Sequence, residues 1–202
     1  MDRDGVAYCY PREEHRGFKG YVEITPHFIP FLKQVHDLGY ELRLLTFNPE
    51  GGRALMDAVQ HSGSCEFRNW DLDKVPSCCF KTEFRNKLQI FDGERPSKAS
   101  YVDLSRDFLW IEDGISFAEA KALLRSGRAD CYRYVDNRSY GALWRCLPWI
   151  KGHPITRGSR RVYPGDAELN VRMQAPVTPA EVAKVPRGLS IRKTLERKLN
   201  EG

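Results

Sequence analysis

The stretch of residues 25–48 constrains the fold more than any other part of the chain, because a strong helix pattern runs directly into a strong strand pattern. Thr25 followed by a proline is typical of a helix start, and apolar residues then recur at helical spacing until Gly39. The next segment, residues 40–47, becomes continuously apolar towards its end, which is typical of a strand covered on both faces. The pattern therefore predicts an amphipathic helix followed at once by a buried strand.

Strand and helix patterns continue to alternate further along the chain. Short apolar runs predict strands at residues 87–91, 108–111 and 131–135. Amphipathic segments predict helices at residues 50–61, 116–125 and 139–149. Strands that alternate with helices are joined by crossover connections, and such connections are typical of a parallel sheet. We therefore predict the α/β class with a mainly parallel sheet.

The last quarter of the chain has a different character. From Gly152 onward proline and glycine recur with little periodicity, and only residues 189–199 predict a short helix, which is basic. Residues 151–202 hold 11 Lys and Arg against 5 Asp and Glu, whereas residues 1–150 are almost balanced at 21 against 22. We predict one domain at residues 1–150 and a basic extension at residues 151–202.

Composition excludes several classes of protein. No apolar run approaches the roughly 20 residues that a bilayer-spanning helix needs, and the first five residues lack the charge order of a signal peptide. The cysteines form no CxxC pair, so we interpret them as reduced thiols of an intracellular protein, cytoplasmic or in an organelle. They are Cys9, Cys65, Cys78, Cys79, Cys131 and Cys146.

Polar residues stand in or just after the apolar segments at three places, and ligands bind at the carboxyl ends of strands in open parallel sheets. Asp2 and Asp4 are spaced so that one carboxylate can attack while the other transfers protons. Thr46 lies near the end of the second segment, where a hydroxyl could hold a phosphoryl oxygen. Glu112 and Asp113 follow the third segment, where carboxylates could hold Mg²⁺.

In this order the three places resemble the motifs of the haloacid dehalogenase (HAD) superfamily. The sequence DRDGV at residues 2–6 resembles its first motif, DxDG[TV], Thr46 its second, and Glu112 with Asp113 its acidic fourth. The third motif is a lysine, for which Lys98 is the nearest candidate. Its rivals are Lys87 and Lys81. The segment 100–113 also resembles, loosely, the carboxy-terminal-domain phosphatase branch of the superfamily, without that branch's lysine.

The resemblance covers residues 1–150 and implies a three-layer Rossmann-like sandwich. Residues 7–22 would form a short flap instead of a large cap domain, leaving the site open to a phosphorylated small molecule or macromolecule. Flap residues that could contact the substrate are Arg12, His15, Arg16 and Lys19.

The implied activity is that of a Mg²⁺-dependent phosphohydrolase acting on a phosphomonoester. Asp2 would form an aspartyl phosphate, and Asp4 would protonate the leaving group and then activate water. Thr46 and Lys98 would orient and neutralise the phosphoryl oxygens. Mg²⁺ would be held by Asp2, Asp4, Glu112 and Asp113.

Two alternatives stay open at this point. Only Met1 stands before Asp2, so the strand that should carry the nucleophile lies upstream of this sequence or another segment fills its place. In a second register residues 6–10 form the central strand, and the chain is then catalytically inactive. An inactive HAD-like domain would serve as an interaction or scaffold protein, with residues 151–202 binding RNA or an acidic partner.

Overall fold

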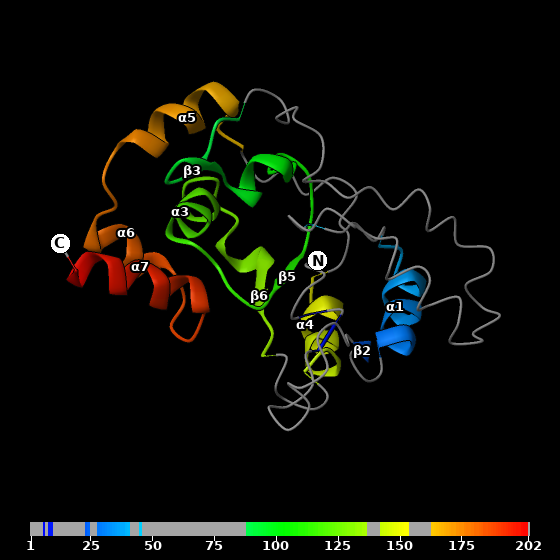
Figure 1. The fold of residues 1–202 in the computed structure, drawn as a ribbon. Coiled ribbons are helices and arrows are strands. Elements are labelled where there is room, and N and C mark those ends of the chain that lie inside the picture. The colour runs from blue at the N-terminus through cyan, green and yellow to red at the C-terminus, as the bar shows by residue number, and fades with distance from the viewer. Residues whose placement is uncertain are drawn as a thin grey trace. The chain divides into compact units, whose positions relative to one another are not determined.

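The computed structural model describes residues 6, 8–9, 23–24, 28–40, 45, 88–136, 142–153 and 163–201 (Figure 1). The chain divides into two compact units. The first comprises Met1–Phe80, Ile111–Asp113 and Val135–Ile155. The second comprises Lys81–Trp110, Gly114–Tyr134 and Thr156–Gly202. Each unit is therefore built from segments that lie far apart in the sequence.

The first unit contains one small sheet and two helices among its described residues. Strand β1 (Tyr8–Cys9) pairs antiparallel with β2 (Glu23–Ile24), with Tyr8 opposite Ile24. Helix α1 spans Phe28–Asp37, and the 3-10 turn η7 (Trp144–Cys146) leads into helix α4 (Leu147–Lys151). Helix α1 contacts α4.

Helix α1 confirms the helix predicted at residues 25–39. Phe28, Phe31 and Leu32 recur at helical spacing and are buried together on one face. Gly39 follows the helix with a φ of 84°, a left-handed conformation that glycine adopts without the steric penalty of a Cβ. Just beyond, the Tyr40 hydroxyl donates a hydrogen bond to the carbonyl of His153.

The second unit is mostly helical. In chain order it contains β3 (Phe91–Asp92), β4 (Arg95–Pro96), η5 (Lys98–Tyr101), α3 (Phe117–Arg125), η6 (Ala129–Cys131), β6 (Tyr132–Tyr134), α5 (Asp166–Gln174), α6 (Pro179–Lys184) and α7 (Ser190–Asn200). Strand β5 (Trp110–Glu112) begins at Trp110, the last residue of the unit's first segment. It forms a two-stranded sheet with β6.

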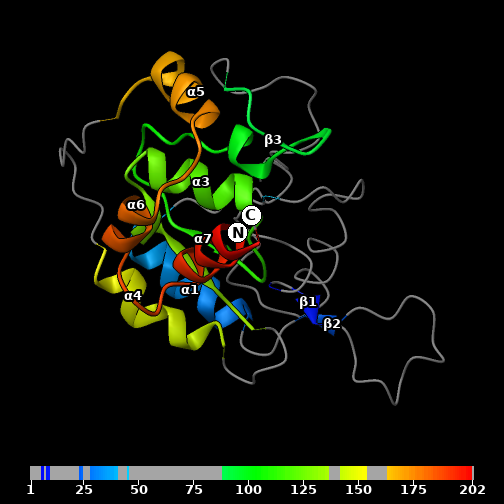
Figure 2. The same cartoon turned by 90° about the vertical axis from the view of Figure 1, so that its left-hand side faces the viewer.

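Helix α3 lies at the centre of the second unit, as the views in Figure 1 and Figure 2 show, and it contacts α5, α7 and η5. Three of its five buried residues are alanines, including Ala120 and Ala122, so neighbouring helices can approach closely. The covering helices contribute fully buried apolar residues, among them Leu169 of α5 and both Ile191 and Leu195 of α7. Burial of these side chains supplies the hydrophobic core of the unit.

The described residues show a mixed α/β protein, mostly helical, with small two-stranded sheets; they do not show a larger parallel sheet. Residues 108–111 were predicted as a strand, and β5 occupies Trp110–Glu112. The strand predicted at 87–91 is wrong for the most part, because residues 88–90 belong to no helix or strand, and β3 forms a hairpin with β4 around Gly93. Of the strand predicted at 131–135, only Tyr132–Tyr134 is strand.

Three helix predictions can be compared with the structure. The helix expected at 116–125 is confirmed by α3, with Ser116 as its N-cap. The helix expected at 139–149 is replaced, within its described part, by η7 and α4. The helix expected at 50–61, like most of the strand expected at 40–47, lies outside the described residues.

The extension is more ordered than its sequence predicts. Helix α7 confirms the short basic helix expected at residues 189–199. Helices α5 and α6 were not predicted. Both help to cover the unit's core, since Leu169 of α5 and Val182 of α6 are buried. Residues 163–201 therefore pack as an integral part of the second unit.

Arg128 secures the loop that precedes β5 against the end of α3. Its side chain is only 2% exposed, its Nε–H donates to the Leu104 carbonyl at 3.2 Å, and its Nη1 lies 3.6 Å from the Asp107 carboxylate. Its backbone N–H donates to the Leu123 carbonyl at 2.7 Å. A long cationic side chain buried in this way fills space and neutralises a local charge at once.

We predict that Arg128→Ala lowers the free energy of unfolding by about 2–4 kcal/mol, because it leaves a cavity and an unsatisfied buried carbonyl. The matched control is Arg106→Ala, since Arg106 is 78% exposed and pairs with Asp103 on the surface. That variant should change the free energy of unfolding by less than about 0.5 kcal/mol. Urea denaturation followed by circular dichroism measures both, and equal losses in the two variants would contradict the role given to Arg128.

Candidate functional site

Only part of the predicted catalytic site falls within the described residues. Asp2, Asp4 and Thr46 lie outside them, as do the rival lysines and the flap contacts. These are Lys81, Lys87, Arg12, His15, Arg16 and Lys19. Lys98, Glu112 and Asp113 can therefore be placed, and the other predicted site residues stay predictions.

Glu112 and Asp113 lie where the sequence predicts them, at the carboxyl end of a short buried strand. Glu112 is the last residue of β5 and is 3% exposed, and Asp113 beside it is partly exposed. The Glu112 carbonyl accepts a hydrogen bond from the Val135 N–H at 2.9 Å, just after β6. The two carboxylates thus lie at the end of β5, and the strand that pairs with β5 is β6.

The turn after these carboxylates is held in place by specific contacts. The Gly114 carbonyl accepts a hydrogen bond of 2.9 Å from the Tyr132 hydroxyl. The ring of Tyr132 also packs edge-on against Trp110, with centroids 6.0 Å apart. Ser116 then caps α3, its hydroxyl accepting from the Glu119 N–H at 3.3 Å. A short turn that begins with the acidic pair therefore joins β5 to the capped start of α3.

Lys98 has a structural partner that the sequence did not indicate. It is the first residue of η5, and its backbone N–H donates to Glu119 Oε1 at 3.2 Å. Lys98 belongs to the second unit, whereas Glu112 and Asp113 belong to the first. A role of Lys98 beside the acidic pair therefore stays a prediction.

The described residues contain no group of three or more His, Cys, Asp or Glu side chains that could hold a metal ion. Glu112 and Asp113 offer two oxygen ligands, the type that Mg²⁺ prefers. Mg²⁺ commonly uses one or two carboxylates and completes its octahedron with water or substrate oxygens. The carboxylates of Glu112 and Asp113 are therefore ligands of the type that Mg²⁺ binds.

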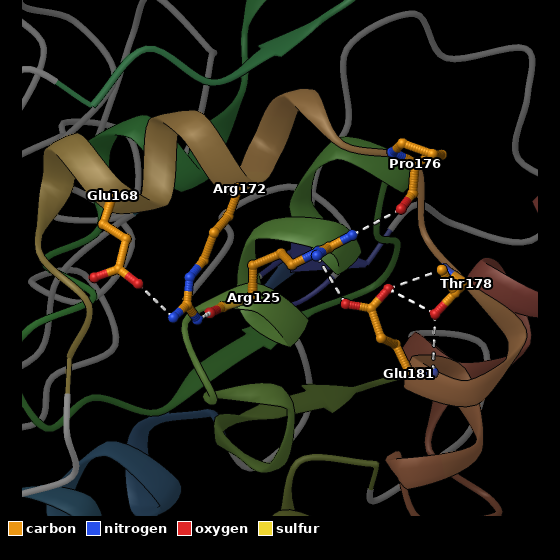
Figure 3. A network of polar contacts seen from close by, with 6 residues as sticks. All are labelled: Arg125, Glu168, Arg172, Pro176, Thr178 and Glu181. Carbon is orange, nitrogen blue, oxygen red and sulfur yellow. Dashed lines mark hydrogen bonds and ion pairs between the residues drawn. The ribbon is translucent and has the colours of Figure 1, made fainter.

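A second group of charged residues, which sequence reasoning missed, surrounds the end of α3 (Figure 3). Arg125 Nη1 pairs with Glu181 at 2.7 Å, and Arg125 Nη2 donates to the Pro176 carbonyl at 2.8 Å. Arg172 of α5 pairs with Glu168 and reaches the Arg125 carbonyl at 3.5 Å. We call these residues the Arg125 network; it links α3 to α5, to α6 and to the segment between them.

Glu181 is engaged through both carboxylate oxygens. Oε1 pairs with Arg125, and Oε2 accepts from the Thr178 N–H at 2.9 Å and from the Thr178 hydroxyl at 3.0 Å. The Thr178 hydroxyl also accepts from the Glu181 N–H, which completes a capping box at the start of α6. The sequence pattern Thr-Pro-x-Glu at residues 178–181 could have revealed this helix start.

The network shifts two titration equilibria. The pKa of Glu181 lies below its ordinary value, first because of the Thr178 backbone hydrogen bond and then because of the Thr178 hydroxyl and the positive charge of Arg125. The pKa of Lys121 is also lowered, mainly by desolvation and secondly by Arg125, one turn further along α3. Lys121 and Arg125 therefore lie close enough on α3 for the charge of one to affect the titration of the other.

Two hollows border the network. One, of about 360 Å³, is lined by Leu124, Arg125, Arg172, Glu181 and Lys184. The other, of about 450 Å³, shares the first three of these residues and extends towards Tyr163 and Pro164. We call the first, between α3, α5 and α6, the cationic hollow, because three of its five lining residues carry positive charge.

Four of the eight Lys and Arg residues that the structure describes in the extension pair with a carboxylate. Arg172 pairs with Glu168. On α7, Arg192 pairs with Glu196, and both Arg197 and Lys198 pair with Glu201. Local carboxylates therefore match only part of the basic excess, and three of the four cations on α7 are among those matched.

Comparison of the chain with protein-family models, with curated proteins and with solved structures finds no match. Within the described residues, no helix is long and apolar enough to cross a membrane. The site is therefore argued from its own residues.

We predict that Glu181→Gln lowers the free energy of unfolding by about 0.5–1 kcal/mol at pH 7, since glutamine keeps the capping hydrogen bonds but removes the charge that faces Arg125. A depressed folded-state pKa means that the charge stabilises the protein above the ordinary pKa of 4.5 and ceases to do so as pH falls through the folded value. The difference between wild type and variant should accordingly disappear in acid. Urea titrations between pH 3 and pH 7 measure it.

Glu196→Gln is the control for that series, because Glu196 pairs with Arg192 on the exposed face of α7 and caps no helix. Its effect should stay below about 0.5 kcal/mol at every pH. A Glu181 variant that behaves like this control would show that the network does not secure α6.

Proposed function

We propose that the chain is a Mg²⁺-dependent phosphohydrolase that acts on a phosphomonoester through an aspartyl phosphate. The observation that supports this most is the position of Glu112 and Asp113 at the carboxyl end of β5. Ligands of open α/β sheets bind at that end of the strands. A capped helix follows directly, and β6 lies beside β5, so the local order is strand, acidic turn, helix and strand.

The proposal includes a Rossmann-like sheet of which β5 and β6 would be two strands. Residues 40–47, of which Leu45 is described and buried, would supply a third. Thr46 would then stand at the same edge of the sheet as Glu112 and Asp113. The helix before residues 40–47 is the confirmed α1, which agrees with the strand–helix alternation of this fold class.

The proposed reaction has two phosphoryl-transfer steps. In the first, an Asp2 carboxylate oxygen attacks phosphorus, the ester P–O bond breaks, and Asp4 donates its proton to the departing alkoxide. In the second, Asp4 takes a proton from water, the water oxygen attacks phosphorus, and inorganic phosphate leaves with Asp2 restored. Thr46 and Lys98 would hold the phosphoryl oxygens by hydrogen bonding and charge.

Asp2, Asp4, Glu112 and Asp113 would hold the magnesium ion. Mg²⁺ would neutralise the phosphoryl charge and so allow a carboxylate to approach a dianion. The roles of Glu112 and Asp113 are therefore electrostatic, and no proton passes through them.

We predict that the purified chain releases phosphate from p-nitrophenyl phosphate only when Mg²⁺ is present. Asp2→Asn should reduce the rate at least about a thousandfold, because the amide cannot form the acyl phosphate. Asp113→Asn should reduce it about tenfold to a hundredfold and raise the Mg²⁺ concentration needed for half-maximal rate. Release of p-nitrophenolate, followed by absorbance, measures all three proteins.

Asp71→Asn is the matched control, since Asp71 belongs to a second Asp-x-Asp sequence at residues 71–73 that has no assigned role. It should leave the rate within about twofold of wild type. A folded chain that is inert towards a panel of phosphomonoesters would overturn the proposal. It would favour the non-catalytic alternative, in which the extension binds RNA or an acidic partner and binding weakens steeply with salt.

A further inference from the structure

The cationic hollow gathers positive charge from helices that are remote in the sequence. Arg125 comes from the end of α3, Arg172 from α5 and Lys184 from the end of α6. Lys121 lies one turn before Arg125 on α3, so the two cations face the same side of the helix. Crowding like charges is unfavourable, and an anion bound between them relieves the repulsion.

The one carboxylate that lines the hollow is already satisfied. Both oxygens of Glu181 are engaged, by Arg125 on one side and by Thr178 on the other. Its charge therefore compensates Arg125, while Arg172 is paired with Glu168 and Lys184 forms no ion pair with a described carboxylate. Arg172 shares its guanidinium between Glu168 and a long contact of 3.5 Å to the Arg125 carbonyl (Figure 3).

Two donor groups of the lining residues have no partner within the described part of the chain. The Nε atom of Arg125 is buried without a hydrogen-bond acceptor. Lys184 is exposed, and it forms no ion pair with a described residue. A buried N–H without an acceptor is uncommon in folded proteins and calls for a ligand, an ion or a water molecule.

We propose that the cationic hollow binds the phosphate group of a small molecule. Arginine forks match the oxygens of a phosphate in geometry and charge, and a lysine adds a compact positive charge. A volume of about 360 Å³ suits a small ligand, and Leu124 is the one apolar side chain of its lining. The lining therefore favours a compact, highly charged ligand over an apolar one.

The ligand is either inorganic phosphate or a small phosphomonoester, since both present the same oxygens. The hollow is built from the second unit alone, whereas Glu112 and Asp113 belong to the first. The inference thus does not rest on the proposed phosphohydrolase activity. It adds a binding site without assigning it a catalytic step.

Titration calorimetry of the full chain with sodium phosphate tests the proposal. The Asp2→Asn protein in EDTA, at constant ionic strength, removes turnover and metal-dependent binding elsewhere. We expect binding at millimolar concentrations or below, weakened at least about tenfold by Arg172→Gln combined with Lys184→Gln, which removes two charge-assisted contacts. Both side chains are exposed, so the double variant should fold; its circular dichroism spectrum checks this.

The matched control is Lys193→Gln combined with Arg197→Gln, which removes two exposed cations of α7 and changes the net charge equally. It should retain phosphate binding within about twofold. Equal weakening in the two double variants would overturn the proposal by showing a general charge effect. Absence of binding at 10 mM phosphate (about ten times the highest expected Kd) would overturn it as well.

A second titration, with O-phosphoserine in the same buffer, distinguishes the two ligand sources. Tighter binding of O-phosphoserine, lost in the Arg172 and Lys184 double variant, assigns the hollow to a phosphomonoester. Tighter binding of inorganic phosphate, lost in the same variant, assigns it to the free ion. Both titrations are repeated with Mg²⁺ in place of EDTA. Binding that appears only with Mg²⁺ and disappears in Asp113→Asn would instead place the phosphate at the proposed catalytic site and overturn the inference.

Discussion

The buried carboxylate of Glu119 joins two parts of the second unit, the start of α3 and the start of η5. One of its oxygens accepts from the Ser116 N–H at 2.8 Å and the other from the Lys98 N–H at 3.2 Å. The start of α3 and the start of η5 are thereby held by a single side chain. Because α3 is the helix on which α5 and α7 pack, its starting point determines where the extension can settle. The same starting point follows directly on the acidic turn at residues 112–114.

The elements that the sequence predicts correctly are those with a local signal. Helix α3 has a capping box and an apolar face, and α1 has a regular apolar pattern that ends at Gly39. Helix α5 lacks such a signal, since Leu169 is its one buried residue. Helix α6 is only six residues long, too short for periodicity to show. The described strands have two or three residues each, too few for an alternating pattern to be recognised in the sequence.

The acidic pair and the cationic hollow also differ in whether the sequence carries a local signal for them. Glu112 and Asp113 could be placed at a strand end from the sequence, because an apolar run stops and carboxylates follow within one segment. The cationic hollow could not be predicted, because Arg125, Arg172 and Lys184 meet only after three helices have packed. Net charge was also a poor guide, since some cations pair with carboxylates across the predicted boundary at residue 150, as Arg125 does with Glu181, and others pair within the extension, as Arg172 does with Glu168. Counting charges along a chain cannot distinguish a paired cation from an available one.

The second unit is assembled from three segments, the last of which begins after residue 155. Helix α3 is synthesised some forty residues before the helices that cover it. During translation its apolar faces therefore remain open until α5, α6 and α7 have emerged from the ribosome. A nascent chain arrested between these points would expose Leu123 and its alanine neighbours to solvent, as chaperone substrates do. Folding of this unit is accordingly tied to completion of residues 166–200, and it cannot proceed domain by domain from the N-terminus.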